Sequence, residues 1–178
     1  MAQFEGSGRG SGNYISITAE AAANLPFPLC EPLIPQDYVC TAPTFYIREP
    51  LSARKGREGF RTIAGYNIIG ELLIAEVLTN SLKHSRGTKD ISVQYAYDTE
   101  KTRLIVSIQD DDPQPPVPRA ASNDAENGRG SGLIASQASA YGCYPVYSDA
   151  EEIIGKVVWF SLDLIAPSEV PTLTSTAS

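Results

Sequence analysis

The sequence predicts an α+β fold: a two-layer α/β sandwich with a mostly antiparallel, mixed sheet and helices on one face. Two observations support this class. Some segments repeat apolar residues with the helical period, while others alternate apolar and polar residues as strands do. The alternating segments also follow one another across short polar turns, which favours antiparallel pairing beside a layer of helices.

Three helices are expected. The clearest places Ile74, Leu78 and Leu82 every four positions, which gives one apolar stripe. An earlier helix begins at Ser52, whose hydroxyl suits an N-cap. A glycine-rich stretch opens the third helix. By residue range, the predicted helices are 52–63, 70–85 and 128–141.

The predicted strands alternate in hydrophobicity. In the second of them, Asp110 has the same parity as Leu104, Val106 and Ile108, so it is expected to point toward the core side of the sheet. A polar loop with four prolines, 111–127, follows and has the length of a functional lid. Four strands are predicted. The first spans 90–97, and the second begins directly after the turn 98–102 and contains Leu104, Val106 and Ile108. The third and fourth span 143–147 and 156–164, with Gly155 between them.

The folded domain is expected to span residues 43–165, between a flexible leader at 1–42 and a flexible tail at 166–178. The net charge of −7, with scattered Lys and Arg, argues against direct nucleic-acid binding. Three cysteines without paired spacing argue against a zinc cluster or a disulfide framework. No apolar run is long enough to span a membrane, so a cytoplasmic protein is expected.

Glu76 and Asn80 are the first candidate site residues. They lie four positions apart, so on a helix they share a face, which His84 continues one turn later. A carboxylate and an amide on one face suit a metal–phosphate site, because oxygen atoms bind Mg²⁺ and a carboxylate can take a proton. Taken alone, the pair fits an ordinary solvated helix face better.

Two further features could complete a nucleotide site. A core-facing Asp110 needs a partner, and the amino group of adenine is one; alternatively, the strand has already ended and Asp110 starts an acidic loop. The GRGSG stretch at 128–132 could cradle phosphates at a helix start. The same five residues occur at 8–12 without a following helix pattern, so only the position gives this string weight.

Four stretches in order resemble the histidine-kinase-like ATPase superfamily with its Bergerat ATP-binding fold, and more narrowly the small anti-sigma-factor serine kinases of actinobacterial type. They are AEVLTNSLKHS (75–85), VSIQDDDPQPPVPR (106–119), NGRGSGLIASQASAYG (127–142) and GKVVWFSLDL (155–164). The resemblance covers about two thirds of the chain, and the four stretches occur in the order of the family. One position departs from the superfamily, because Asp112 stands where a glycine is usual.

The resemblance implies ATP and Mg²⁺ as cofactors. Glu76 is then the general base, Asn80 the Mg²⁺ ligand and Asp110 the acceptor of the adenine amino group. The backbone around Gly128, Gly130 and Gly132 binds the phosphates in that scheme. Arg129 is the one cation in this loop, and its position, not the resemblance, indicates a contact with the γ-phosphate.

The function that the resemblance implies is an ATP-dependent protein serine/threonine kinase that regulates transcription. It would hold a sigma factor, phosphorylate an anti-anti-sigma protein of the STAS type, and could form a homodimer. The alternative is a non-catalytic binding module whose affinity for a partner depends on the bound nucleotide. A structural α+β domain without a ligand is a third reading, and it requires all four stretches to be accidental.

Overall fold

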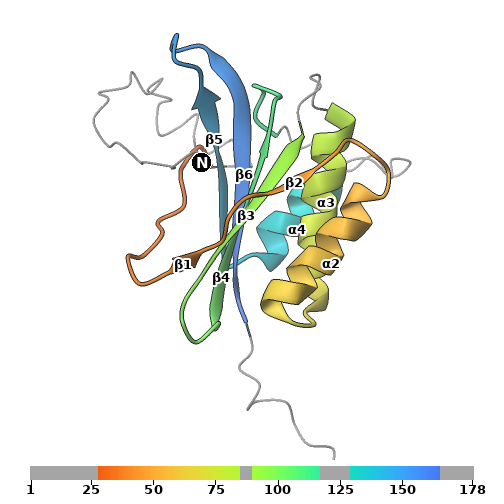
Figure 1. Cartoon of the computed structure of the whole chain (residues 1–178), viewed down its shortest axis with the longest axis vertical. Coiled ribbons are helices and arrows are strands. Elements are labelled where there is room, and N and C mark those ends of the chain that lie inside the picture. The colour runs from red at the N-terminus through yellow and green to blue at the C-terminus, as the bar shows by residue number, and fades with distance from the viewer. Residues whose placement is uncertain (1–27, 85–89, 117–128, 165–178) are drawn as a thin grey trace, which may run out of the picture.

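Figure 1 shows the computed structural model of the chain, which describes residues 28–84, 90–116 and 129–164, the first three residues of the last range by their backbone only. The helices are α2 (Ser52–Ala64), α3 (Ile68–His84) and α4 (Arg129–Gln137). The strands are β1 (Val39–Cys40), β2 (Thr44–Tyr46), β3 (Ile91–Tyr97), β4 (Arg103–Asp110), β5 (Ala140–Tyr147) and β6 (Ile153–Asp163).

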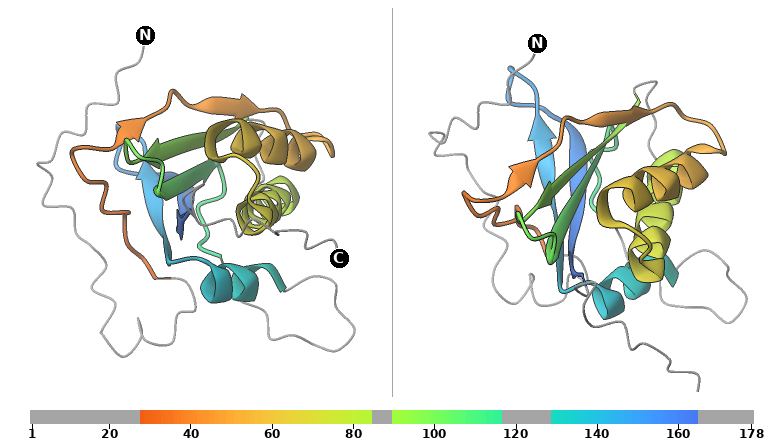
Figure 2. Two further views of the ribbon diagram at one scale, coloured as in Figure 1. Left: turned by 90° about the horizontal axis from the view of Figure 1, so that it is seen from below. Right: turned by 60° about the horizontal axis from the view of Figure 1, so that its bottom comes forward.

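The strands form one open six-stranded sheet with the order β1-β3-β4-β6-β5, and β2 also pairs with β3. All pairings between these strands are antiparallel. The sequence predicted a mostly antiparallel but mixed sheet, and the mixed part of that prediction does not apply to these strands. One isolated parallel bridge joins Leu29 to Cys143. The three helices lie on one face of the sheet in both views of Figure 2. The predicted α+β class is therefore confirmed.

The main core lies between the helices and the sheet. Ile74 and Leu78 of α3 are fully buried there, together with the alternating residues Leu104, Val106 and Ile108 of β4. Because side chains alternate along a strand, the residues between them, Ile105 and Ser107, point to the other face. The periodicities that predicted these two elements thus correspond to the surfaces that they bury.

The second face of the sheet carries a smaller apolar cluster. Ala96, Ile105 and Trp159 are buried there and pack against Tyr38 and Tyr144. The chain at 28–40 runs along this face, as Figure 2 shows, and the indole N–H of Trp159 donates to the carbonyl oxygen of Cys30 at 2.7 Å. Strand β1 also falls in the stretch 1–42 that the sequence favoured as a leader, so regular structure begins before residue 43.

Several element boundaries differ from the predicted ones. Helix α4 ends at Gln137, and Tyr141 lies in β5 opposite Phe160, because the sheet ladder already begins where Ser139 N–H donates to the Ser161 carbonyl. Ser52 is not the N-cap of α2 but its first residue, and its hydroxyl donates to the carbonyl oxygen of Ile47 at 2.5 Å. The predicted lid at 111–127 falls outside the described residues from 117 onward.

Gly155 lies inside β6, although it was predicted to separate two strands. A Cβ atom at this position would come within 2.2 Å of the Asp110 carbonyl oxygen. Real Cβ atoms do not approach an oxygen this closely, so glycine permits the end of β4 to lie tightly against β6. This contact matters for the site, because it fixes the backbone that carries Asp110.

The packing of Gly70 gives a first stability prediction. A Cβ at Gly70 would lie 2.0 Å from the ring of Phe60, which is fully buried, so Gly70→Ala is expected to destabilise the fold by about 1–3 kcal/mol through overpacking. Gly132→Ala is the matched control, because it is also a helical glycine and nothing lies within 4 Å of its added Cβ. Urea unfolding measures both; equal stability of Gly70→Ala and wild type would contradict the prediction.

Candidate functional site

Glu76 and Asn80 meet on α3, as the helical spacing predicted. The side-chain amide of Asn80 donates a hydrogen bond to Oε1 of Glu76 at 3.1 Å, and both residues are half-buried. The amide oxygen of Asn80 and the second carboxylate oxygen of Glu76 remain as acceptors, which is the kind of ligand that Mg²⁺ prefers. His84 is exposed in the last turn of α3.

Asp110 ends β4 on the helix-facing side of the sheet, so the reading in which it merely starts a loop is wrong. Its side chain is only 1% exposed. Oδ1 accepts from the ammonium group of Lys156 at 2.9 Å and from the backbone N–H of Asp112 at 3.1 Å. Oδ2 is buried and has no hydrogen-bond partner among the described residues. An acceptor in this state is suited to a ligand that donates a hydrogen bond.

Lys156 is the site residue that the sequence reasoning missed. It stands opposite Asp110 in the β4–β6 ladder, and its ammonium group also reaches the carboxylate of Asp112 at 3.1 Å. The sequence does contain a signal for Lys156, which is its position in the alternating pattern of β6. Lys156 lies on the same face of this strand as Val158, Phe160 and Leu162, all of them in the core. A lysine on a buried face needs an anionic partner. Register alone decides that this partner is Asp110.

Asp112 stands where the resembled superfamily has glycine, and its environment limits the effect of its charge. It is buried, its carboxylate shares the ammonium group of Lys156 with Asp110, and its Oδ1 accepts from the backbone N–H of Gln114 at 3.2 Å. Lys156 also donates to the Asp112 carbonyl oxygen at 3.2 Å. The three side chains of Asp110, Lys156 and Asp112 form a buried cluster, called the Lys156 cluster below, with two carboxylates and one ammonium group.

The predicted phosphate loop is described only in part. Gly128 lies outside the described residues, while Arg129, Gly130 and Gly132 form the first turn of α4. A helix therefore opens where the sequence predicted one, and its first N–H groups have no partners within the helix. Gly132 is exposed, with open space around it. The side chain of Arg129 is not described, so its contact with a phosphate stays a prediction.

The fold brings these elements to one face. Helix α3 contacts both β4 and α4, and Figures 1 and 2 show α3 and α4 on the same side of the sheet. The arrangement can offer a buried hydrogen-bond acceptor from β4, oxygen ligands from α3 and backbone N–H groups from α4. Within the described residues, no three His, Cys, Asp or Glu side chains gather into a metal-binding cluster.

Two further structural findings concern a second surface hollow and the character of the helices. A hollow lies between α2 and α3. The residues that line it include none of the predicted nucleotide-binding residues and no member of the Lys156 cluster. No helix in the described part of the chain combines the length and apolar character needed to cross a bilayer.

Comparison with known proteins adds no further assignment. No protein-family model matches the chain, and a search of curated proteins finds no match. The fold defines an α+β protein with an open antiparallel sheet and a helical layer on one side.

Proposed function

We propose that this chain is an ATP-binding regulatory protein with the Bergerat fold of the histidine-kinase-like ATPases. The observation that carries the proposal is the unpaired Oδ2 of Asp110, which is buried at the end of β4. Leaving such an acceptor without a partner costs about 1–3 kcal/mol, and a ligand N–H recovers that cost. The exocyclic amino group of adenine is a donor of this kind.

The second support is the pairing on α3. The hydrogen bond from Asn80 fixes the Glu76 carboxylate. Because the amide nitrogen of Asn80 makes this bond, the amide oxygen stays available as a ligand for Mg²⁺. When bound, MgATP supplies a transferable phosphoryl group and the cation that neutralises its charge. Glu76 accepts the proton of an attacking hydroxyl through its second oxygen, and the N–H groups at the start of α4 offer partners for phosphate oxygens.

Lys156 supports the proposal at the position that departs from the superfamily. A bare carboxylate at Asp112 would repel nucleotide phosphates, whereas here an ammonium group 3.1 Å away compensates it. Asp110 keeps Oδ2 for the ligand because Oδ1 alone takes the hydrogen bonds from Lys156 and the Asp112 backbone.

The activity that best fits these residues is that of a cytoplasmic anti-sigma-factor-type protein serine/threonine kinase. In this role it phosphorylates an anti-anti-sigma partner of the STAS type and sequesters a sigma factor, as a monomer or a homodimer. The alternative is a nucleotide-dependent binding module without turnover in the same kind of partner-switching pathway. Both use Asn80 and Asp110, and they differ in whether Glu76 transfers a proton.

Discrimination between purine bases tests the nucleotide proposal. Inosine triphosphate carries an exocyclic carbonyl oxygen on C6 where ATP carries the amino group, so wild type is expected to bind ATP at least about tenfold more tightly. Asp110→Asn is expected to lose that preference, since a neutral amide no longer presents a carboxylate oxygen to the base. Calorimetry with Mg²⁺ measures both nucleotides.

The ratio of the two affinities is the readout because Asp110→Asn also weakens the contact with Lys156 and can lower both affinities together. Asp163→Asn is the matched control, since its carboxylate is 66% exposed and pairs with Arg103 at the other end of β4. Equal binding of the two nucleotides by wild type, or no binding of ATP, would show that Asp110 does not recognise adenine.

A further inference from the structure

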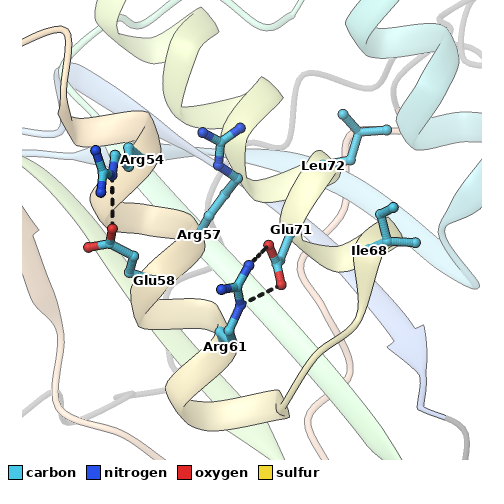
Figure 3. A pocket seen from close by; sticks show the side chains of 7 residues that line it. All are labelled: Arg54, Arg57, Glu58, Arg61, Ile68, Glu71 and Leu72. Atoms are coloured by element: carbon cyan, nitrogen blue, oxygen red, sulfur yellow. Dashed lines mark hydrogen bonds and ion pairs between the residues drawn. The ribbon is translucent and has the colours of Figure 1, made fainter.

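The hollow between α2 and α3 has a volume of about 580 Å³ and an unusual charge for this protein. Three arginines and two glutamates line it, together with Ile68 and Leu72. In Figure 3, Arg61 points toward Glu71 at the start of α3, whereas Arg54 points toward Glu58 on its own helix. The whole chain has a net charge of −7, so this surface is locally opposite in sign to the rest of the molecule.

The arginines differ in their partners. Arg54 pairs with Glu58 at 3.0 Å, and Arg61 holds Glu71 through two hydrogen bonds of 2.8 and 2.6 Å. Hydrogen bonding to the Arg61 guanidinium holds the pKa of Glu71 below its usual range, so this carboxylate stays charged near neutral pH. Arg57 lies between the two pairs and makes no hydrogen bond or ion pair of its own with the described residues.

Two aliphatic side chains of α3 border the hollow beside Glu71 and are open to solvent. Ile68 is 66% exposed and Leu72 is 46% exposed, although both belong to a helix whose other face is in the core. Tyr66, close to them in sequence, is 76% exposed, and the Arg61 guanidinium lies over its ring, 5.5 Å from the ring centre of the tyrosine. Exposed aliphatic and aromatic side chains beside arginine are typical of protein–protein contacts.

We propose that this hollow is a docking site for an acidic segment of a partner protein in which a carboxylate lies next to an apolar side chain. The carboxylate binds Arg57, whose guanidinium fork matches it in two parallel hydrogen bonds. The neighbouring apolar side chain covers Ile68 and Leu72. A free inorganic anion would satisfy Arg57 alone and leave both aliphatic side chains in water, so the combination favours a peptide.

This docking site is separate from the nucleotide site of the proposed function. None of the residues that line the hollow is Glu76, Asn80, Asp110 or Lys156. Both surfaces nevertheless share α3, because Leu72 lies one helical turn before Glu76. The proposal therefore stands or falls independently of ATP binding.

A titration of the full chain with a synthetic peptide tests the proposal, followed by the backbone amide signals in ¹H–¹⁵N NMR spectra. The probe is the peptide SGEELDLEGS. Its two comparison peptides are SGQQLNLQGS, which lacks the carboxylates, and SGEESDSEGS, which lacks the apolar side chains. The acidic and apolar probe is expected to shift signals from 54–61 and 68–72, and each comparison peptide is expected to bind at least about tenfold more weakly.

Arg57→Gln is expected to weaken the probe at least about tenfold, because it removes the charge and the fork. Arg103→Gln is the control, since it makes the same change at another exposed arginine, on β4. Absence of shifts at millimolar peptide, shifts outside the two stretches, or an unchanged affinity of Arg57→Gln would each overturn the proposal. Equal binding of all acidic probes and of inorganic phosphate would show an anion site only. Concentration-dependent shifts without peptide at the same residues would assign the hollow to a second copy of the chain and also overturn it.

Discussion

Lys156→Met is expected to destabilise the fold by about 3–5 kcal/mol, because it leaves two buried carboxylates without their counter-charge. The side chains of Asp110 and Asp112 are 1% and 12% exposed, and Lys156 itself is 9% exposed. Water therefore cannot replace the ammonium group at Asp110. Methionine keeps the length and the apolar contacts of the lysine stem, so the loss reports the charge and its hydrogen bonds.

Chemical unfolding of the full chain measures this loss. Arg103→Met is the matched control, since it breaks the exposed ion pair with Asp163 on the same two strands and is expected to cost less than about 1 kcal/mol. The triple variant Asp110→Asn, Asp112→Asn, Lys156→Met is expected to recover part of the loss, because it removes the unpaired charges. A Lys156→Met protein as stable as the Arg103→Met protein would refute a compensating role for Lys156.

Glu76→Gln is expected to lower phosphoryl transfer from MgATP by a factor of about 10²–10⁴ while leaving ATP binding unchanged. The amide has nearly the same shape and still accepts the hydrogen bond from Asn80, but it cannot take a proton from an attacking hydroxyl or water. Binding and turnover therefore separate, which distinguishes a base from a residue that only holds the nucleotide.

Release of phosphate from ATP and radiolabel transfer to serine-containing STAS-type proteins measure turnover, and calorimetry measures binding. Glu100→Gln is the control, because it makes the same chemical change at an exposed position in the turn between β3 and β4. Equal turnover by Glu76→Gln and wild type would remove Glu76 from the base role. Tight ATP binding by a wild type without turnover would instead favour the non-catalytic module.

The long periodic elements of this fold could be read from the sequence. The apolar stripe of α3 and the alternation of β3 and β4 are repeated often enough to reveal the period and the buried face. The strands β1 and β2 have two and three residues, which is too short for any period to emerge. They exist because the edge of β3 offers hydrogen-bonding groups to whatever chain lies beside it.

Boundaries depended on contacts that the sequence does not contain. Gly155 was predicted as a break because glycine often marks turns. It lies inside β6 instead, and this strand position requires glycine because β4 approaches too closely for any side chain. Tyr141 fits a helical pattern with Ile134 and Ala138, and it belongs to β5 because the ladder with β6 gives its backbone better partners.

The sequence by itself determined the α+β class, the shared face of Glu76 and Asn80 and the core-facing parity of Asp110, because each follows from a local period. Only the tertiary structure decided what surrounds them. The β4–β6 register sets Lys156 against Asp110 and leaves one buried carboxylate oxygen for a donor, and the packing of α2 on α3 places Ile68, Glu71 and Leu72 beside the arginines of α2. The physical reason is that hydrogen-bond partners and burial arise between segments far apart in the chain, where no periodicity connects them.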